Sequence, residues 1–311
     1  MSKAVARNQG QRELLKIYDD LCYTRSRWEV WQDMVIIIAT AISNSVDAKR
    51  YEEREKLYLE RISKYNPGAQ RNFVSLFNKI ICILDDNPFQ DLLGDLFMLL
   101  GLGNDAGGQF FTPYSVCQMM GKMVVVSSNC KDEIKRKGYF SVNDCACGAG
   151  ATLIGAAEAL YLEKINYQQT ALFIAQDIDY TTALMCYIQL SLLGCAGYVR
   201  IGDSLSNPLT GDVLFGEGSS NVWYTPMYFS ETWHDRRKIA AMKKIIDSTA
   251  HKTIALRDNN EPLYDTPSGT LVLPPEKPST PILEEQEPVK VIEVTAANKR
   301  RQAQGQLAFD I

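Results

Sequence analysis

One glycine-rich segment constrains the fold of this chain more than any other, and it reads Asp144-Cys-Ala-Cys-Gly-Ala-Gly-Ala-Thr152. The pattern before it predicts a β-strand that ends near Asn143, and the apolar pattern after it predicts a helix from Ala151. Glycine permits positive φ and close approach of a ligand to the backbone, while the start of a helix offers free N–H groups to an anion. A strand, a glycine turn and a helix in this order are typical of the ligand-binding edge of an open α/β sheet. An ordinary tight turn between a strand and a helix has the same form.

The chain after residue 107 alternates between predicted strands and predicted helices. Alternation of this kind indicates an α/β fold with a mostly parallel sheet. His251–Leu256 is a candidate for one further strand. The predicted strands are Gly138–Asn143, Ala171–Asp177, Tyr198–Ile201 and Asn221–Thr225, and the predicted helices are Ser115–Val126, Ala151–Ile165 and Tyr180–Leu193.

The two flanks differ from this middle part. Residues 11–105 carry apolar side chains at helical spacing, so we predict a helical N-terminal domain over residues 1–106. The sheet domain then extends over residues 107–258. Residues 262–288 hold seven of the 12 prolines, with three glutamates close together. This composition predicts a disordered tail over residues 259–311.

Composition argues against several classes of protein. The net charge is −4 over 311 residues, so any contact with DNA has to come from local basic patches. The eight cysteines form no Cys-x-x-Cys pair and there are only two histidines, which argues against a metal site. Residues 1–12 are polar and do not form a signal peptide, and the apolar run Met34–Ala41 is too short to span a bilayer. We therefore expect a cytoplasmic protein.

Acidic side chains follow two further predicted strands. Asp177 lies at the end of its strand, where α/β folds hydrogen-bond the ribose hydroxyls of a nucleotide-like ligand. Asp179 has the alternative role of capping the next helix. Asp203 follows the strand Tyr198–Ile201, and turn capping is its alternative role. The sequence therefore predicts that Asp177 and Asp203 lie at the same edge of the sheet as the glycine turn.

Four motifs occur in order, and together they are more specific than any one alone. They are Gly108-Gln-Phe-Phe-Thr-Pro113, the turn Asp144–Gly150, Asp177-Ile-Asp179 and Gly202-Asp-Ser-Leu205. This series resembles the N6-adenine DNA methyltransferases, and among them the modification subunits of type I restriction systems. The resemblance implies a Rossmann-like sheet that binds S-adenosylmethionine. The cofactor-binding residues that it implies are Phe110, Phe111, Thr112 and Pro113 in the aromatic loop, Asp144, Cys147, Gly148 and Gly150 in the turn, Asp177 at the ribose and Asp203 beside the adenine.

The methyl-transfer motif of this family is Asn/Asp/Ser-Pro-Pro-aromatic, at the end of the fourth strand. Here the fourth predicted strand leads into Thr225-Pro226-Met227-Tyr228. By resemblance, Thr225 would accept a hydrogen bond from the N6 amine of a flipped adenine, and Tyr228 would stack on the base. Pro226 is retained, whereas Met227 stands where the family has a second proline. A threonine hydroxyl also differs from a carboxamide in reach.

Two functions are consistent with this pattern. The first is an adenine-N6 DNA methyltransferase that uses S-adenosylmethionine, linked to restriction–modification or to phage and mobile-element biology. The second is a catalytically weak or inactive methyltransferase-like subunit that binds DNA or a partner. Restoring asparagine at 225 and proline at 227 would then raise activity. The expected partners are DNA, a specificity or restriction subunit, and a sliding clamp that would bind the C-terminal segment Gln304–Phe309.

Overall fold

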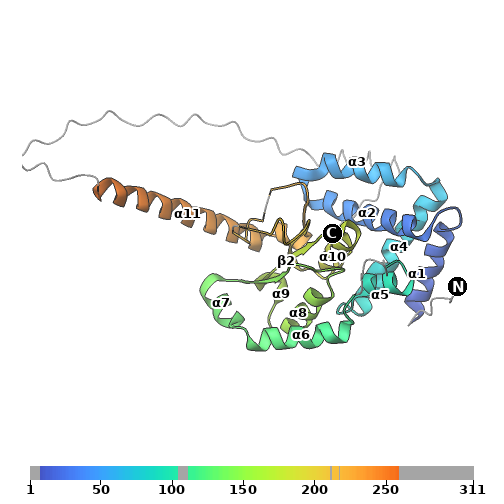
Figure 1. Cartoon of the computed structure of the whole chain (residues 1–311), viewed down its shortest axis with the longest axis horizontal. Helices are drawn as coiled ribbons and strands as arrows, with labels where there is room; N and C mark the ends of the chain where they lie inside the picture. The colour runs from blue at the N-terminus through green and yellow to red at the C-terminus, as the bar shows by residue number, and fades with distance from the viewer. Residues whose placement is uncertain (1–7, 104–110, 211, 217, 259–311) are drawn as a thin grey trace, which may run out of the picture. The chain divides into compact units, whose positions relative to one another are not determined.

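The computed structural model describes residues 8–103, 111–210, 212–216 and 218–258 and contains a four-stranded sheet, of which Figure 1 labels β2. The first three strands are parallel neighbours, so the predicted α/β fold with a mostly parallel sheet is confirmed. The strands are β1 (Phe140–Asp144), β2 (Ala171–Asp177), β3 (Ala196–Ile201) and β4 (Val222–Tyr224), in the spatial order β1-β2-β3-β4.

Burial of each strand follows its position in the sheet. The first six residues of β2 are buried, because this strand has a neighbour on each side and helices pack on it. β1 pairs with β2 alone among the described residues. Its burial alternates accordingly, with Phe140 buried and Ser141 and Asn143 exposed. The turn that follows β1 therefore lies at the border of the described sheet.

Two segments differ from the prediction. β4 runs antiparallel to β3, with Tyr224 opposite Tyr198, so the chain after β4 continues at the amino-terminal end of β3. His251–Leu256 is not a strand, because it lies within α11 (Glu231–Asp258). No glycine or proline interrupts α11, so nothing in this run ends the helix.

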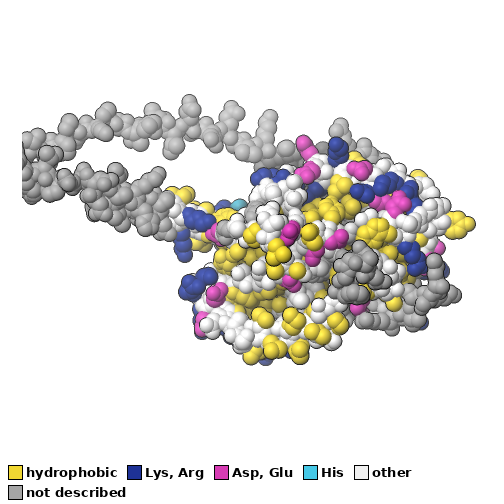
Figure 2. Space-filling view, in the orientation of Figure 1, with side chains coloured by type: hydrophobic (Ala, Val, Ile, Leu, Met, Phe, Trp, Pro, Cys, Tyr) yellow, Lys and Arg dark blue, Asp and Glu magenta, His cyan; other side chains and the backbone are white. Residues whose placement is uncertain are grey.

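Helices pack on the sheet and on one another. α8 (Ala151–Leu162) connects β1 to β2, and α10 (Tyr180–Leu192) connects β2 to β3. Right-handed connections that advance in the same direction place both helices on one face of the sheet. α10 is buried from Thr181 to Leu190, because α2 (Arg27–Val46) packs against it as the sheet does. α6 (Tyr114–Ser127) packs on α8 and leaves apolar side chains at the surface (Figure 2).

The N-terminal part is helical, as predicted, and several of its helices begin at polar caps. The Ser26 side chain accepts a hydrogen bond from Glu29 N, and Asn66 accepts one from Ala69 N. Nowhere in the described ranges is a helix long and apolar enough to cross a membrane. The remaining elements are α1 (Gln9–Leu21), η1 (Ala48–Arg50), α3 (Tyr51–Ile62), α4 (Pro67–Asp86), α5 (Leu92–Leu99), α7 (Cys130–Lys137), α9 (Tyr167–Thr170) and η3 (Pro226–Phe229).

A buried arginine joins the helical part to the sheet. Arg54 of α3 is 2% exposed, and its guanidinium lies 3.8 Å from the ring centre of Trp223 in β4. The same group donates to Val222 O at 2.8 Å and to the hydroxyl of Ser43 in α2. Asp47 supplies a carboxylate 3.6 Å away. The helical and sheet segments thus share buried polar contacts.

The chain divides into two compact units, Met1–Lys238 and Ile239–Ile311. The predicted boundary between residues 106 and 107 falls inside the first unit. The division of the chain into a helical domain, a sheet domain and a tail stays a prediction. The predicted tail, residues 259–311, lies outside the described residues, and so does the proposed clamp-binding segment within it.

Candidate functional site

The glycine turn between β1 and α8 has a backbone conformation that other residues rarely adopt. Gly148 has φ +52° and Gly150 has φ +97°. A Cβ at Gly150 would lie 2.8 Å from Sγ of Cys186, and a Cβ at Gly148 would lie 3.3 Å from the ring of Phe111. Glycine is therefore required at 150 by both conformation and space. The turn presents bare backbone at the carboxyl edge of the sheet.

Asp177, at the end of β2, is joined to this turn. Its Oδ2 accepts a hydrogen bond from Gly148 N at 2.7 Å. Its Oδ1 accepts one from Asp179 N at 2.9 Å, and the hydroxyl of Thr182 lies 3.3 Å away. The loops after β1 and β2 consequently form one site. Asp179 caps α10, since its side chain accepts a hydrogen bond from Thr182 N at 2.8 Å.

Asp144 and Cys147 shape the turn from within. Asp144 accepts hydrogen bonds from Ala146 N at 3.0 Å and from the hydroxyl of Thr152. Cys147 is buried, and a hydrogen bond with Cys186 together with burial raises the pKa of its thiol. Its side chain therefore faces the core. In the part of the chain that the structure covers, no group of three or more His, Cys, Asp and Glu side chains is arranged to hold a metal ion.

The loop after β3 meets the same edge. Gly202 N donates to Asp177 O at 2.8 Å, which ties this loop to the end of β2. The Asp203 carboxylate accepts a hydrogen bond from Leu205 N at 2.9 Å, and this bond lowers the pKa of Asp203. Gln176, which the sequence prediction missed, is buried and donates from Nε2 to Gly202 O at 3.2 Å. The ends of β1, β2 and β3 are thus linked by hydrogen bonds.

The aromatic loop adjoins the glycine turn. The ring of Phe111 contacts the turn and lies 5.5 Å, centre to centre, from the ring of Phe97 in α5. Thr112 and Pro113 are exposed just before α6 begins. Phe110 lies outside the described residues. The structure therefore brings Phe111 to the turn and leaves its two neighbours at the surface beside it.

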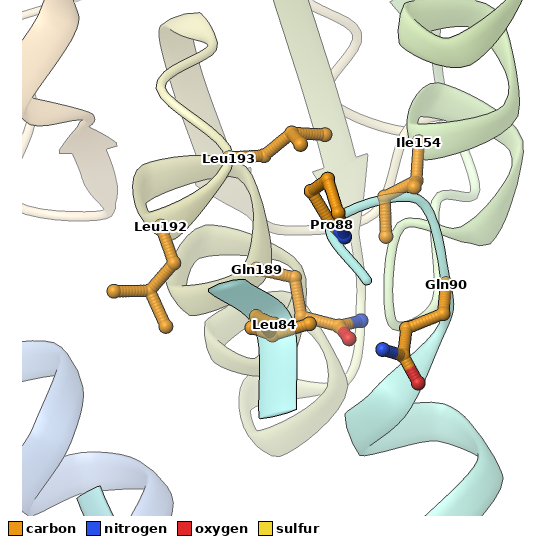
Figure 3. Close-up of a pocket in the computed structure, with 7 residues that line it drawn as sticks. All are labelled: Leu84, Pro88, Gln90, Ile154, Gln189, Leu192 and Leu193. Atoms are coloured by element: carbon orange, nitrogen blue, oxygen red, sulfur yellow. The ribbon is translucent and has the colours of Figure 1, made fainter. Parts of the chain in front are cut away.

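Gln189 of α10 supports the turn from the core side, and the sequence prediction missed it as well. Its Nε2 lies 2.9 Å from Ala149 O and 2.8 Å from Asp91 Oδ1, and its Oε1 accepts a hydrogen bond from Leu93 N at 3.0 Å. Figure 3 shows this side chain in a small pocket beside Leu84, with residues of the connection from α4 to α5. Burial raises the pKa of Asp91. Gln189 belongs to no motif, so only the fold reveals its role.

Thr225 lies at the opposite end of the strands from these loops. Because β4 is antiparallel to β3, Thr225 lies beside the amino end of β3, about 17 Å along the strand direction from the carboxyl edge. Its hydroxyl donates to Cys195 O at 2.7 Å and accepts from Gly197 N at 3.0 Å. Thr225 is 0% exposed. The antiparallel pairing of β4 therefore places Thr225 away from the glycine turn, and its role as a catalytic residue stays a prediction.

Pro226 and Tyr228 form part of η3, directly after Thr225. Tyr228 is buried, and its hydroxyl donates to Leu214 O at 3.1 Å. The Arg237 guanidinium lies 3.9 Å from the centre of its ring, and the Tyr224 ring lies 4.6 Å away. Protein side chains thus occupy the surroundings of the ring that a stacked base would need. The structure does not bring these residues to the glycine turn.

Comparison with known proteins gives matches to a family model, to one relative and to one solved structure. A family model described as N-6 DNA Methylase matches residues 90–259. The type I restriction enzyme MjaIX methylase subunit of Methanocaldococcus jannaschii is 26% identical over 225 residues, which is 68% of this chain and 37% of that subunit. The chain thus spans little more than a third of the length of this relative. The crystal structure of a type I restriction-modification methyltransferase subunit from Streptococcus thermophilus matches with 18% identity and a TM-score of 0.35, over 66% of this chain and 46% of that one.

Proposed function

The chain belongs to the N-6 DNA methylase family, and from this premise we propose that it binds S-adenosylmethionine at the carboxyl edge of its sheet. We further propose that it acts as a methylase-like subunit whose own 225–228 segment transfers no methyl group. The hydrogen bond from Gly148 N to Asp177 Oδ2 is the observation that carries the first part, because it joins two loops that a nucleoside-like ligand contacts. The burial of Thr225 carries the second part.

The residues at this edge fit the cofactor. The first turn of α8 would hold the carboxylate of the methionine moiety with its free N–H groups and positive end. Asp177 Oδ2 has a lone pair besides the one that Gly148 N occupies, so it would accept a hydrogen bond from a ribose hydroxyl. Asp203 would lie toward the adenine, and Phe111 would cover the turn. When bound, the cofactor supplies a methyl group on a positively charged sulfonium.

Transfer to adenine requires a hydrogen-bond acceptor beside that methyl group. The hydroxyl of Thr225 donates to Cys195 O and accepts from Gly197 N, at the far edge of the sheet. The sulfonium would lie at the glycine turn, so Thr225 is too distant to polarise a substrate amine there. This separation supports the weak or inactive subunit over an adenine-N6 methyltransferase that acts through residues 225–228.

DNA and a partner protein remain the proposed partners. Because the chain is similar to a type I restriction methylase subunit, we propose that a separate subunit supplies DNA sequence recognition, as part of a restriction–modification system or a related mobile element. The proposed clamp contact through Gln304–Phe309 stays a prediction.

Calorimetry and a labelled-methyl assay test the two parts separately. The full chain should bind S-adenosylmethionine, and Gly148→Ala should weaken binding at least tenfold, because alanine strains at φ +52° and its Cβ meets Phe111. Gly101→Ala is the matched control, since Gly101 has φ +65° and no atom of the described residues lies within 4 Å of its Cβ position. No measurable binding would refute the cofactor site. Transfer of labelled methyl to plasmid DNA by the wild-type chain, lost in Thr225→Val, would refute the proposed absence of catalysis.

A further inference from the structure

α6 is largely apolar apart from a polar flank of Ser115, Gln118 and Lys122, yet only its inner side is packed among the described residues. Its inner side rests on α8 through Cys117, Gly121 and Val125, and the backbones approach so closely that a Cβ at Gly121 would lie 2.4 Å from Gly155 O. Its outer side consists of exposed apolar side chains, which lie at the surface over α6 in Figure 2. They are Val116, Met119, Met120, Met123, Val124 and Val126, between 39% and 74% exposed.

α10 shows what a helix of this composition ordinarily does. Helices that are apolar on all sides are buried on all sides, and α10 follows this rule between the sheet and α2. The outer side of α6 is as apolar as the sides of α10, but no described element covers it. The six side chains expose on the order of 600 Å², at the top of the range for apolar patches on monomeric proteins. Such a patch marks an interaction surface.

We propose that the outer side of α6 is the interface between two copies of this chain, related by a two-fold axis. Lys122 is the single charged residue of α6, so the patch has no charge pattern that would select a different partner or repel a copy of itself. A two-fold axis sets identical apolar patches against each other, which makes them complementary without further design. About 600 Å² per copy makes about 1,200 Å² in total, which reaches the lower limit of a standard stable interface.

A lipid surface is a poorer match for this helix. Helices that lie in a membrane interface carry a strongly charged face opposite their apolar face. The face of α6 opposite the patch packs on α8 and has no charged residue. The inference concerns α6 alone and does not depend on whether the cofactor binds.

Light scattering coupled to size-exclusion chromatography of the full chain tests the interface. The wild-type chain should have twice the 34.9 kDa mass of one copy. Met119→Glu with Met123→Glu should raise the dissociation constant at least tenfold, because both side chains lie in the patch and are more than half exposed. Glutamate forms helices about as well as methionine, so folding should be retained and is checked by the melting temperature. Leu59→Glu, at a 47% exposed position on α3, is the matched control and should leave the dimer intact.

A cross-linking experiment gives a second readout. Met123→Cys with a short bis-maleimide should yield a covalent dimer that the wild-type chain, with its exposed Cys82 and Cys145, does not yield. A wild-type chain that stays monomeric at every concentration measured would overturn the proposal. A dimer that persists in the double glutamate variant would overturn it too, and so would a monomer that binds phosphatidylcholine vesicles through α6.

Discussion

Replacing Thr225 with valine tests whether this residue is part of the sheet or part of a reaction centre. Valine has nearly the shape of threonine, so it fills the same space and lacks only the hydroxyl. That hydroxyl donates to Cys195 O and accepts from Gly197 N in a site with 0% exposure. The placement in the structure predicts that Thr225→Val lowers stability and leaves cofactor affinity unchanged.

The size of the effect follows from the two backbone groups that lose their partner. A buried polar group without a hydrogen bond costs about 1–3 kcal/mol. No water reaches this site to replace the hydroxyl, so Thr225→Val should lower the free energy of unfolding by about 2–4 kcal/mol. For a unit of this length, that corresponds to a fall in melting temperature of roughly 5–15 °C.

Thermal unfolding followed by circular dichroism measures this loss, and calorimetry with S-adenosylmethionine well below the transition measures affinity. Thr225→Ser is the matched control, because it keeps the hydroxyl and removes one methyl group, which costs about 0.8 kcal/mol. Affinity should agree within about twofold among the three proteins, since the glycine turn follows β1 on the far side of the sheet and lies about 17 Å from Thr225 along the strand direction alone.

A Thr225→Val variant with the melting temperature of the wild type would refute the placement of Thr225 as a buried residue of the sheet. Markedly weaker cofactor binding by this variant would refute it too. Thr225→Asn with Met227→Pro sharpens the test. The sequence alone predicts that this pair restores the family motif and raises activity. The structure predicts that it yields no methyl transfer and lowers stability by about 1–3 kcal/mol, because the longer and more polar asparagine amide enters a fully buried site.

Three further outcomes are expected. Gly121→Ala should lower the free energy of unfolding by about 1–3 kcal/mol in a denaturant titration, because its Cβ would lie 2.4 Å from Gly155 O; an unchanged midpoint would contradict the close contact of α6 with α8. Gln189→Leu should cost about 2–4 kcal/mol by leaving Ala149 O and its other buried partners unpaired, and unchanged thermal unfolding would show that it does not support the turn. Burial raises the pKa of the Asp91 carboxyl in the folded state above its usual value of 3.8. The folded state therefore binds the carboxyl proton more tightly than the unfolded state does. This stabilisation is lost as pH rises from the unfolded pKa through the folded pKa. Asp91→Asn should remove that part of the pH dependence of the melting temperature, and an identical pH profile would exclude the effect.

The strands and helices around the glycine turn are well predicted from sequence because their signals are local. β2 is a run of buried residues between turns, and the strand found is the predicted one, Ala171–Asp177. The predicted end of the helix at residue 193 is one residue beyond the observed end of α10 at Leu192. Hydrophobic periodicity within a dozen residues suffices for such elements.

The direction of β4 could not be predicted in this way. Its residues read as a strand in either direction, and the direction depends on contacts with distant segments. Arg54 binds Val222 O across 168 residues of sequence, and Thr225 binds the backbone of β3 across about 30. A resemblance of short motifs placed Thr225 by its order in the chain and contained no information on these contacts.

The candidate site likewise contains residues that the sequence predicts and residues that it misses. The glycine turn and Asp177 stand in their expected order, and the structure joins them by a hydrogen bond. Gln176 and Gln189 were missed, because a glutamine in an apolar strand or helix carries no signal until its partners are known. Both hold loop carbonyls through their side-chain amides, Gly202 O and Ala149 O.

The buried Arg54 has a practical consequence for anyone who shortens this gene. Expression of residues 107–311 alone would strip Trp223 of its stacked guanidinium, leave Val222 O unbonded and open the surface of α10 that α2 now covers. The shortened protein would expose to water the core residues that the N-terminal helices cover, although the predicted domain boundary lies between residues 106 and 107. Truncation between residues 106 and 107 is thus expected to yield aggregated protein, and a fusion partner is better joined before Asn8, where the first described helix begins.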